Sequence, residues 1–171
     1  MPSKINNNVV GHRLIDNGVV VEDITSVSLP NLEHPTETVS SNGMVADVDV
    51  PNPYHYNAME FTVSHNNGAN CNQLATPDLH AMELRVARQV YNVATAKSGN
   101  ESVKYRITGM HKGSEKGTVE NNNPLGSTEK YSVLRFEEEI NGEVVTLIDA
   151  MAGIVRINGI DYGSSVDNLL N

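Results

Sequence analysis

Five Asn-Gly pairs restrict the fold of this 171-residue chain more than any other feature of its sequence. Asn-Gly is the preferred centre of a two-residue β-hairpin turn, because that turn requires positive φ at both positions, which Asn and Gly adopt most readily. The pairs are spread along the chain, at 17/18, 42/43, 67/68, 141/142 and 158/159. The sequence therefore predicts a mainly β protein with several antiparallel hairpins.

The clearest hairpin spans residues 131 to 149, where a turn at Asn141-Gly142 would set Ile140 opposite Glu143 and Phe136 opposite Leu147. Strict alternation then assigns the side chains to two faces. The first face is apolar and carries Leu134, Phe136, Ile140, Val145 and Leu147. The second face is mixed and carries Arg135, Glu137 and Glu139 beside Val144, Thr146 and Ile148.

Further strands follow from the same two signals. Turn chemistry predicts hairpins at residues 154–162 and 12–29, and alternation predicts strands at 58–64 and 103–110. The inward side chains of these two strands would be Met59, Phe61 and Val63, and Val103, Tyr105 and Ile107. At least seven strands are expected.

Three segments are less regular. Residues 79–96 fit either a helix stripe or an alternating strand, and composition alone favours the helix. A short helix is expected at the C-terminus, capped by Ser164 or Ser165, and one or two helical turns are expected before Pro77. Residues 40–57 have no period, so an extended loop is predicted at about this position.

Composition limits the classes of protein to which the chain can belong. Its length suits one domain, taken as residues 1–171, and with two Phe and no Trp the core must rest on aliphatic side chains. A net charge of −9 argues against a protein that grips DNA or anionic lipid. No window is apolar over the length of a membrane span. A single cysteine, Cys71, permits neither an internal disulfide nor a cysteine-based zinc cluster and is expected to be buried.

No catalytic, metal or cofactor site is predicted. The six histidines lack the close spacing of a metal-binding pair, and no nucleophile turn or phosphate-binding loop accompanies them. We therefore expect a protein that is not an enzyme and that needs no cofactor.

Several segments carry a resemblance to one known family. They are KINNNVVG, SLPNLEHPTETVSSNGMVADVDVPNP, NAMEFTVS, HAMELRVARQVYN and EEEINGEVVTLIDAMAGIVRINGIDYGSSVDNLL. Together they resemble, in order and spacing over nearly the whole chain, the major tail tube proteins of P2-like contractile phages, a group that includes the tube subunits of R-type bacteriocins. The stretch before the 103–110 strand and the Asn-rich residues 121–124 depart from that pattern.

This resemblance implies two packed antiparallel sheets in a barrel-like sandwich with a short helix. It implies hexameric rings that stack into a tube, and a long strand rather than a helix at residues 80–91. The implied partners are other copies of the chain, the tail sheath, and the baseplate, tape measure and tail terminator proteins, with transient passage of DNA if the particle is a phage. The implied location is a virion tail or a bacteriocin particle assembled in the host cytoplasm.

Two surfaces are expected to serve assembly. By the same resemblance, the long loop would reach the neighbouring subunit or the next ring through Gly43, Met44, Val45, Ala46, Val48 and Val50. These side chains are more apolar than a permanently solvated loop requires. Glu137 and Glu139 are expected to form an acidic face on the lumen or on a seam between subunits, where acidic charge would repel passing DNA.

Two alternatives remain open from the sequence. A type VI secretion ring protein would have a related architecture and similar composition. A β-barrel that binds a small molecule belongs to a different class and would be monomeric.

Overall fold

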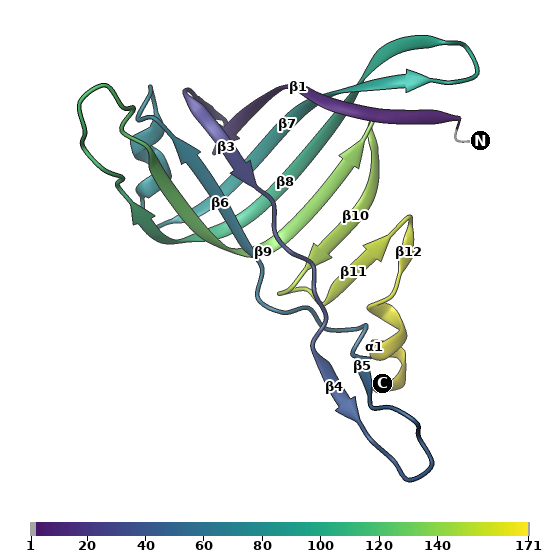
Figure 1. Ribbon diagram of the computed structural model, residues 1–171. Coiled ribbons are helices and arrows are strands. Elements are labelled where there is room, and N and C mark those ends of the chain that lie inside the picture. The colour runs from purple at the N-terminus through teal and green to yellow at the C-terminus, as the bar shows by residue number, and fades with distance from the viewer. Residues whose placement is uncertain (1–2, 171) are drawn as a thin grey trace.

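Four long antiparallel strands form the frame of the computed structural model, which describes residues 3–170 (Figure 1). They are β1 (Lys4–Asp16), β7 (Leu79–Asn92), β8 (Lys97–Glu115) and β9 (Ser127–Ile140). In the sheet they lie in the order β9-β8-β7-β1. Ladders of this length place residues from distant parts of the sequence side by side.

Shorter strands extend this frame into a ten-stranded sheet that branches at β9. The first half of β9 pairs with β6 (Glu60–His65), and β6 pairs with β3 (Ile24–Ser28). The second half pairs with β10 (Glu143–Asp149), followed by β11 (Ile154–Ile157) and β12 (Ile160–Asp161). At the other end, β2 (Val19–Val21) pairs with the last residues of β1.

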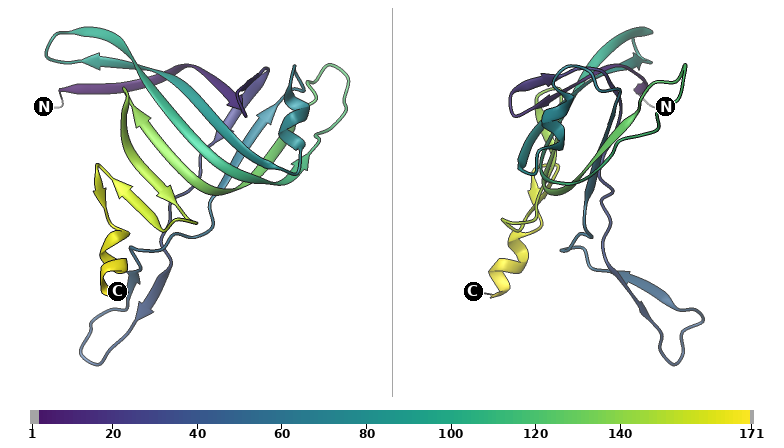
Figure 2. Two further views of the ribbon diagram at one scale, coloured as in Figure 1. Left: turned by 180° about the vertical axis from the view of Figure 1, so that it is seen from behind. Right: turned by 90° about the vertical axis from the view of Figure 1, so that its left-hand side faces the viewer.

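The sheet curls on itself, as the right-hand view of Figure 2 shows. The hydrophobic core lies between the walls of this curl. A short 3₁₀ helix, η1 (Cys71–Ala75), contributes Cys71 and Leu74 to the buried interior. The buried members of the core are Leu14, Val21, Met59, Phe61, Val63, Cys71, Leu74, Met82, Leu84, Ile107, Tyr131, Val133, Phe136 and Ile148. Aliphatic residues predominate in this core, and Cys71 is buried, both as expected.

The mainly β fold class with antiparallel sheets and one short helix is confirmed. Three Asn-Gly pairs form the predicted two-residue turns, which join β1 to β2, β9 to β10 and β11 to β12. The pair at 67/68 does not join paired strands, because the chain leaves β6 there and runs towards η1. The pair at 42/43 lies in a wider loop between β4 (Thr36–Val39) and β5 (Val48–Pro51).

The predicted faces of the 131–149 hairpin are only partly right. Ile140 lies opposite Glu143 as predicted, but a bulge between Val144 and Thr146 sets Phe136 opposite Ile148 rather than Leu147. Phe136 and Ile148 therefore enter the core, while Leu147 faces the other side of the sheet, opposite Glu137.

A second irregularity in β9 changes the inward residues further. Between the pairs Thr108–Arg135 and Gly109–Val133 the register shifts by one residue, which leaves Leu134 as the extra residue of β9. Val133 is thereby buried, and Leu134, which we predicted to be inward, lies outside the core cluster.

The strands predicted at 58–64 and 103–110 and the hairpin at 154–162 are confirmed, whereas the hairpin predicted at 12–29 is limited to Leu14–Val21, because β3 pairs with β6 instead. Met59, Phe61, Val63, Val103 and Ile107 are buried as predicted, and the last two lie on β8, where Tyr105 packs against the core. Residues 79–92 form a strand, as the resemblance implied and as composition alone did not.

The two short helical segments are also present. η1 ends before Pro77, and the C-terminal helix α1 spans Ser164–Leu170. Its first turn is capped by the carboxylate of Asp161, which accepts hydrogen bonds from the N–H groups of Gly163 and Ser164. The hydroxyl groups of Ser164 and Ser165, the two predicted caps, donate hydrogen bonds to the carbonyls of Asp161 and Tyr162. Within residues 3–170, α1 and η1 are too short for a bilayer span.

The segment from Ser40 to Asn57 is more regular than its sequence suggested. Residues 40–57 were expected to form an extended loop, but β5 pairs antiparallel with β4 from Val48 to Pro51. Pro51 occupies the last position of β5, where a missing N–H costs little. The loop is thus a two-stranded hairpin that forms a sheet of its own.

Candidate assembly surfaces

The β4–β5 hairpin projects from the curled sheet, and every residue of its two strands is exposed (Figures 1 and 2). Its neck is fixed by backbone hydrogen bonds from Asn52 to the Pro35 carbonyl, at 2.9 Å, and from Asn57 to the Glu33 carbonyl, at 2.7 Å. The ring of His34 packs on Tyr56 with 4.4 Å between centroids. The hairpin is therefore anchored at its base and free along its length.

The two faces of this hairpin differ in chemistry. Val39 and its partner Val48 project from the same face as Val50 and its partner Glu37, because alternate residues of paired strands share a face. On the opposite face, the Thr38 hydroxyl donates a hydrogen bond of 2.6 Å to the carboxylate of Asp49. We call Val39, Val48 and Val50 the valine face.

The valine face and the tip of the hairpin leave apolar surface in water. Val39, Val48 and Val50 are 43%, 49% and 49% exposed, and Val45 at the tip is fully exposed. Met44 at the tip is also exposed. The structure thus brings Met44, Val45, Val48 and Val50, which were predicted as assembly residues, onto one projecting element, together with Gly43 and Ala46 in its loop. Val39 was not predicted from the sequence, because its place on this face depends on the β4–β5 pairing.

A second unpartnered surface is the outer edge of β1. β7 pairs with one edge of β1 along its length, but β2 covers the other edge only from Leu14 to Asp16. Among the residues that the structure describes, no strand pairs with the outer edge from residue 4 to residue 13. This edge carries the exposed side chains of Ile5, Val9 and Val10. Free strand edges of this kind are ready templates for pairing with another chain.

Glu137 and Glu139 lie on the outward face of β9, within a ladder of ion pairs. The Arg106 guanidinium contacts the carboxylates of Glu137 at 2.5 Å and Glu139 at 2.8 Å. Arg135 contacts Glu137 at 3.0 Å, and Lys104 contacts Glu139 at 3.5 Å. We call this surface, with Glu83 and Arg85 of β7, the ion-pair face.

The ion-pair face is balanced in charge rather than acidic. Its seven residues comprise three carboxylates and four cations, so the two glutamates do not present uncompensated negative charge. The hydrogen bond from Arg106 is the main reason that the pKa of Glu139 lies below its ordinary value. The two glutamates remain candidates for a lumen or seam, but as members of a neutralised surface.

A buried polar cluster surrounds Tyr131 at one end of the sheet. The rings of His80 and His111 pack edge-on against Tyr131, with centroids 5.1 and 5.6 Å away, and the Tyr131 hydroxyl donates a 2.6 Å hydrogen bond to the Leu74 carbonyl. Burial raises the pKa of the Tyr131 hydroxyl. This cluster gathers side chains whose positions in the sequence gave no sign of proximity.

The carboxylate of Asp16 lies at 3.0 Å from Nδ1 of His80, and both groups are buried. Nε2 of His80 lies 2.9 Å from the Thr76 carbonyl, which can only accept a hydrogen bond. Nε2 therefore donates a hydrogen bond to that carbonyl, and Nδ1 faces the Asp16 carboxylate. Burial raises the pKa of Asp16, although the hydrogen bond from His80 opposes that rise.

Glu129 is fully buried and is the second carboxylate of the cluster. Its carboxylate lies 2.8 Å from Nε2 of His111 and 3.2 Å from Nζ of Lys116, and it also accepts a hydrogen bond from Ser114. Nε2 of His65 lies 3.7 Å from the same carboxylate. Within residues 3–170, no group of three or more His, Cys, Asp or Glu side chains is arranged to hold a metal ion.

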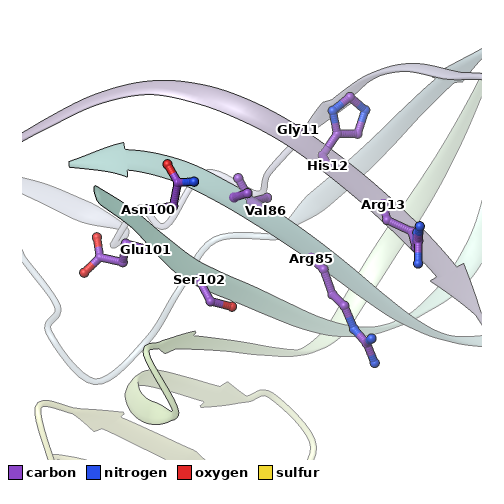
Figure 3. Close-up of a pocket in the computed structure, with 9 residues that line it drawn as sticks. Gly11, His12, Arg13, Arg85, Val86, Asn100, Glu101 and Ser102 are labelled. Carbon is purple, nitrogen blue, oxygen red and sulfur yellow. The ribbon is translucent and has the colours of Figure 1, made fainter. Parts of the chain in front are cut away.

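A shallow depression runs across β1, β7 and β8 (Figure 3). Figure 3 shows that the side chains along it, among them Arg13, Arg85 and Glu101, point in different directions. The Glu101 carboxylate is already engaged by Lys4 and Arg88. The depression therefore presents no convergent set of acid, base and nucleophile.

Comparison with known proteins gives the following matches. A family model described as phage tail tube protein FII matches residues 6–170. No curated protein sequence matches the chain significantly.

Among solved structures, a sheath/tube terminator of an extracellular contractile injection system, PVC, in its extended state aligns with a TM-score of 0.51 at 9% identity. The alignment covers 78% of this chain and 96% of that one. The sheath-tube complex of the same system aligns with a TM-score of 0.49 at 8% identity, over 75% of this chain and 87% of that one. The first of these two alignments supports the fold.

Proposed function

The chain belongs to the phage tail tube protein FII family, and from this premise we propose that its copies close into six-membered rings that stack into the inner tube of a contractile tail. The protein is a structural tail tube subunit. The solved terminator with a similar fold comes from a contractile injection system, which supports placement in a particle of that kind. The family match favours this function over a type VI ring protein or a small-molecule barrel.

The β4–β5 hairpin is the observation that carries the proposal. A two-stranded hairpin with an exposed valine face gains little by projecting into water, since apolar surface is stabilised by burial at roughly 25 cal/mol per Å². Burial of the valine face against a neighbouring subunit or the next ring supplies that stabilisation. The hairpin and its loop, from Gly43 to Val50, then link one subunit to another.

The outer edge of β1 is the proposed site of contact within a ring. Its free N–H and C=O groups would pair with a sheet edge of the neighbouring subunit and continue the sheet around the ring. Because rings stack along one axis, the surfaces at the two ends of a ring differ from each other.

The ion-pair face is proposed to line the lumen or a seam. A surface whose carboxylates are matched by Arg and Lys neither attracts nor strongly repels a polyanion, so DNA could pass without being held. The remaining proposed partners are the sheath, baseplate, tape measure and tail terminator proteins. The proposed location is a virion tail or bacteriocin particle, assembled in the host cytoplasm, and no catalytic activity or cofactor is proposed.

Two substitutions on opposite faces of the hairpin test this function. Val48→Asp places a charge on the valine face, and Thr36→Asp places the same charge on the polar face of the same element. We expect wild type and Thr36→Asp to form tubes visible by electron microscopy, and Val48→Asp to remain as smaller species in light scattering. Tubes of normal length from Val48→Asp would contradict the proposed role of the valine face. A wild-type chain that is monomeric at high concentration and forms no tubes would contradict the function.

A further inference from the structure

One Asn-Gly pair, at 42/43, differs from the other four in backbone conformation. Asn17, Asn67, Asn141 and Asn158 have positive φ values of 48°, 61°, 51° and 50°. Asn42 is not among the positive-φ residues of the described chain. All five asparagines are exposed, so exposure does not distinguish them.

The four left-handed asparagines are also anchored through their backbone N–H groups. The N–H of Asn17 donates to the Ala81 carbonyl at 2.9 Å, and the N–H of Asn67 donates to Nδ1 of His65 at 3.2 Å. The N–H of Asn141 donates to the Ser102 carbonyl at 2.9 Å, and the N–H of Asn158 donates to the Val145 carbonyl at 2.8 Å. Across residues 3–170, the structure gives Asn42 no hydrogen bond from its backbone N–H or its side chain.

Side-chain contacts hold three of the four asparagines further in place. Oδ1 of Asn17 accepts a hydrogen bond of 3.1 Å from the Ala81 N–H. Nδ2 of Asn141 donates to Glu101 at 2.9 Å, and Nδ2 of Asn67 donates to the Leu125 carbonyl at 3.1 Å. These side chains cannot turn towards the following residue without breaking a contact.

The element that carries Asn42 is the least supported part of the sheet structure. β4 and β5 pair only with each other, and an isolated two-stranded hairpin is marginally stable in water. The turn itself is closed by one hydrogen bond of 3.1 Å, from the Met44 N–H to the Ser41 carbonyl. Figure 1 shows this tip far from the curled sheet. Local opening at Asn42 is therefore cheaper than at the other four pairs.

We propose that Asn42 is a site of spontaneous deamidation, the only one of the five Asn-Gly pairs that reacts readily in the folded protein. The backbone nitrogen of Gly43 attacks Cγ of Asn42, which forms an N–Cγ bond and breaks the Cγ–Nδ2 bond. Nδ2 leaves as ammonia with the proton of the Gly43 amide. Water then opens the cyclic imide at either carbonyl, which gives aspartate or isoaspartate at position 42.

Two features make this reaction favourable at Asn42. Gly43 has no side chain to obstruct the attacking nitrogen, and its φ of +98° shows a backbone that is already free of Cβ constraints. Ring closure also requires rotation of the backbone between Asn42 and Gly43, which the hairpin tip can undergo. At the other four pairs the same rotation would break anchoring hydrogen bonds, and at Asn17, Asn141 and Asn158 it would also disturb the strand pairing beside the turn. The reaction is chemistry of the free chain and does not depend on tube formation.

The test is peptide mapping by mass spectrometry after incubation of the purified full-length chain at mildly alkaline pH. We expect conversion at Asn42 to exceed that at each other Asn-Gly pair by roughly tenfold or more, which corresponds to a difference of about 1.4 kcal/mol in the free energy of local opening. An isoaspartate-specific methyltransferase should label the same peptide. Conversion spread evenly over the five pairs, or fastest at another pair, would overturn the proposal.

Two controls separate structure from sequence. In a denaturant that unfolds the chain, all five pairs should convert at similar rates, because the anchoring contacts are lost. A chain in which Asn42 still converts fastest when unfolded would show that flanking residues, and not the fold, set the rate. In Asn42→Gln the position should stay unconverted, because closure of the larger ring is slow, while the other four pairs should keep their wild-type rates.

Discussion

Glu129 shows, at the scale of single residues, how a charged group is retained in the interior of this protein. Burial alone would raise its pKa, but hydrogen bonds from Ser114, His111 and Lys116 outweigh that effect and leave the pKa below its ordinary value. An isolated buried carboxylate would be costly, so these donors stabilise the fold only while the group is ionised. Asp16 differs in sign, because burial raises its pKa.

The sequence could not reveal this cluster. His65, His80 and His111 have none of the close spacing that marks a functional group of histidines, and their carboxylate partners lie up to 64 residues away. Only the long ladders of the sheet bring them together. Without the register of β8 and β9, the sequence gives no sign that these histidines lie near one another.

The first prediction concerns Glu129 and pH. Because its folded pKa is lowered from 4.5, Glu129 contributes stability above pH 4.5 that is lost as the pH falls through its folded pKa. Glu129→Gln should lower the free energy of unfolding at neutral pH by about 1–3 kcal/mol and should weaken the acid dependence. Chemical denaturation across a pH series measures both quantities. Glu143→Gln, on an exposed residue, is the control, and a Glu129→Gln curve parallel to wild type would contradict this account.

At the scale of elements, turn chemistry predicted which strands join but not how they align. The two-residue turns at Asn17, Asn141 and Asn158 were predicted correctly, because their geometry depends on two adjacent residues. The bulges at Leu134 and Val145 were not, because a bulge is stabilised by the neighbouring strands. Each bulge moves later side chains to the opposite face, so Val133 and Ile148 join the core cluster in place of Leu134 and Leu147, although Leu147 is buried outside that cluster.

The strand β7 illustrates a conflict between propensity and context. Its residues favour a helix in isolation, yet β7 lies between β1 and β8 and pairs with both along its length. Pairing with a strand on each side makes these residues a strand rather than a helix. From the sequence, only the family resemblance indicated this strand. The hairpin strand β5 was also missed, because residues 40–57 have no period and were predicted to form an extended loop.

The second prediction concerns the close approach of β8 and β9 beside the Leu134 bulge. A Cβ on Gly109 would lie 2.9 Å from the Ser132 carbonyl oxygen, closer than two such atoms can lie. Gly109→Ala should therefore destabilise the fold by about 1–3 kcal/mol, because backbone has to move. Gly99, also in β8, has nothing within 4 Å of its Cβ position, so Gly99→Ala is the matched control. Equal melting temperatures for the two variants would contradict the close approach.

At the scale of the whole molecule, the structure divides into a curled sheet that buries its own core and a hairpin that buries nothing. The sheet buries the core cluster, whereas the valine face, the apolar side chains at the edge of β1 and a few on other strands, such as Leu79 and Met110, remain exposed. The chain forms a hydrophobic core by itself, but it leaves apolar surface and a free strand edge exposed to water. The sequence indicated the apolar character of the hairpin loop, but the pairing that places Val39 beside Val48 was visible only in the structure.

The last prediction follows from this division. Ordering the Ser40–Asn57 segment costs about 1–2 kcal/mol per residue in backbone entropy, and the free subunit offers it only the β4–β5 hydrogen bonds in return. Amide hydrogen exchange in the free subunit should therefore be fast in β4 and β5 and slow in β8 and β9. In assembled tubes, β4 and β5 should become strongly protected, because the valine face is then buried.

The comparison between states distinguishes assembly from intrinsic order. β7 and β8 serve as internal controls, since their paired central residues should be protected in both states. Equal protection of the hairpin in free subunits and in tubes would contradict ordering on assembly. Removal of residues 43–50 should leave the exchange of the sheet unchanged, because the hairpin makes no contribution to the core, and should abolish tubes. Tubes formed without these residues would show that the hairpin is dispensable and that the β1 edge alone directs assembly.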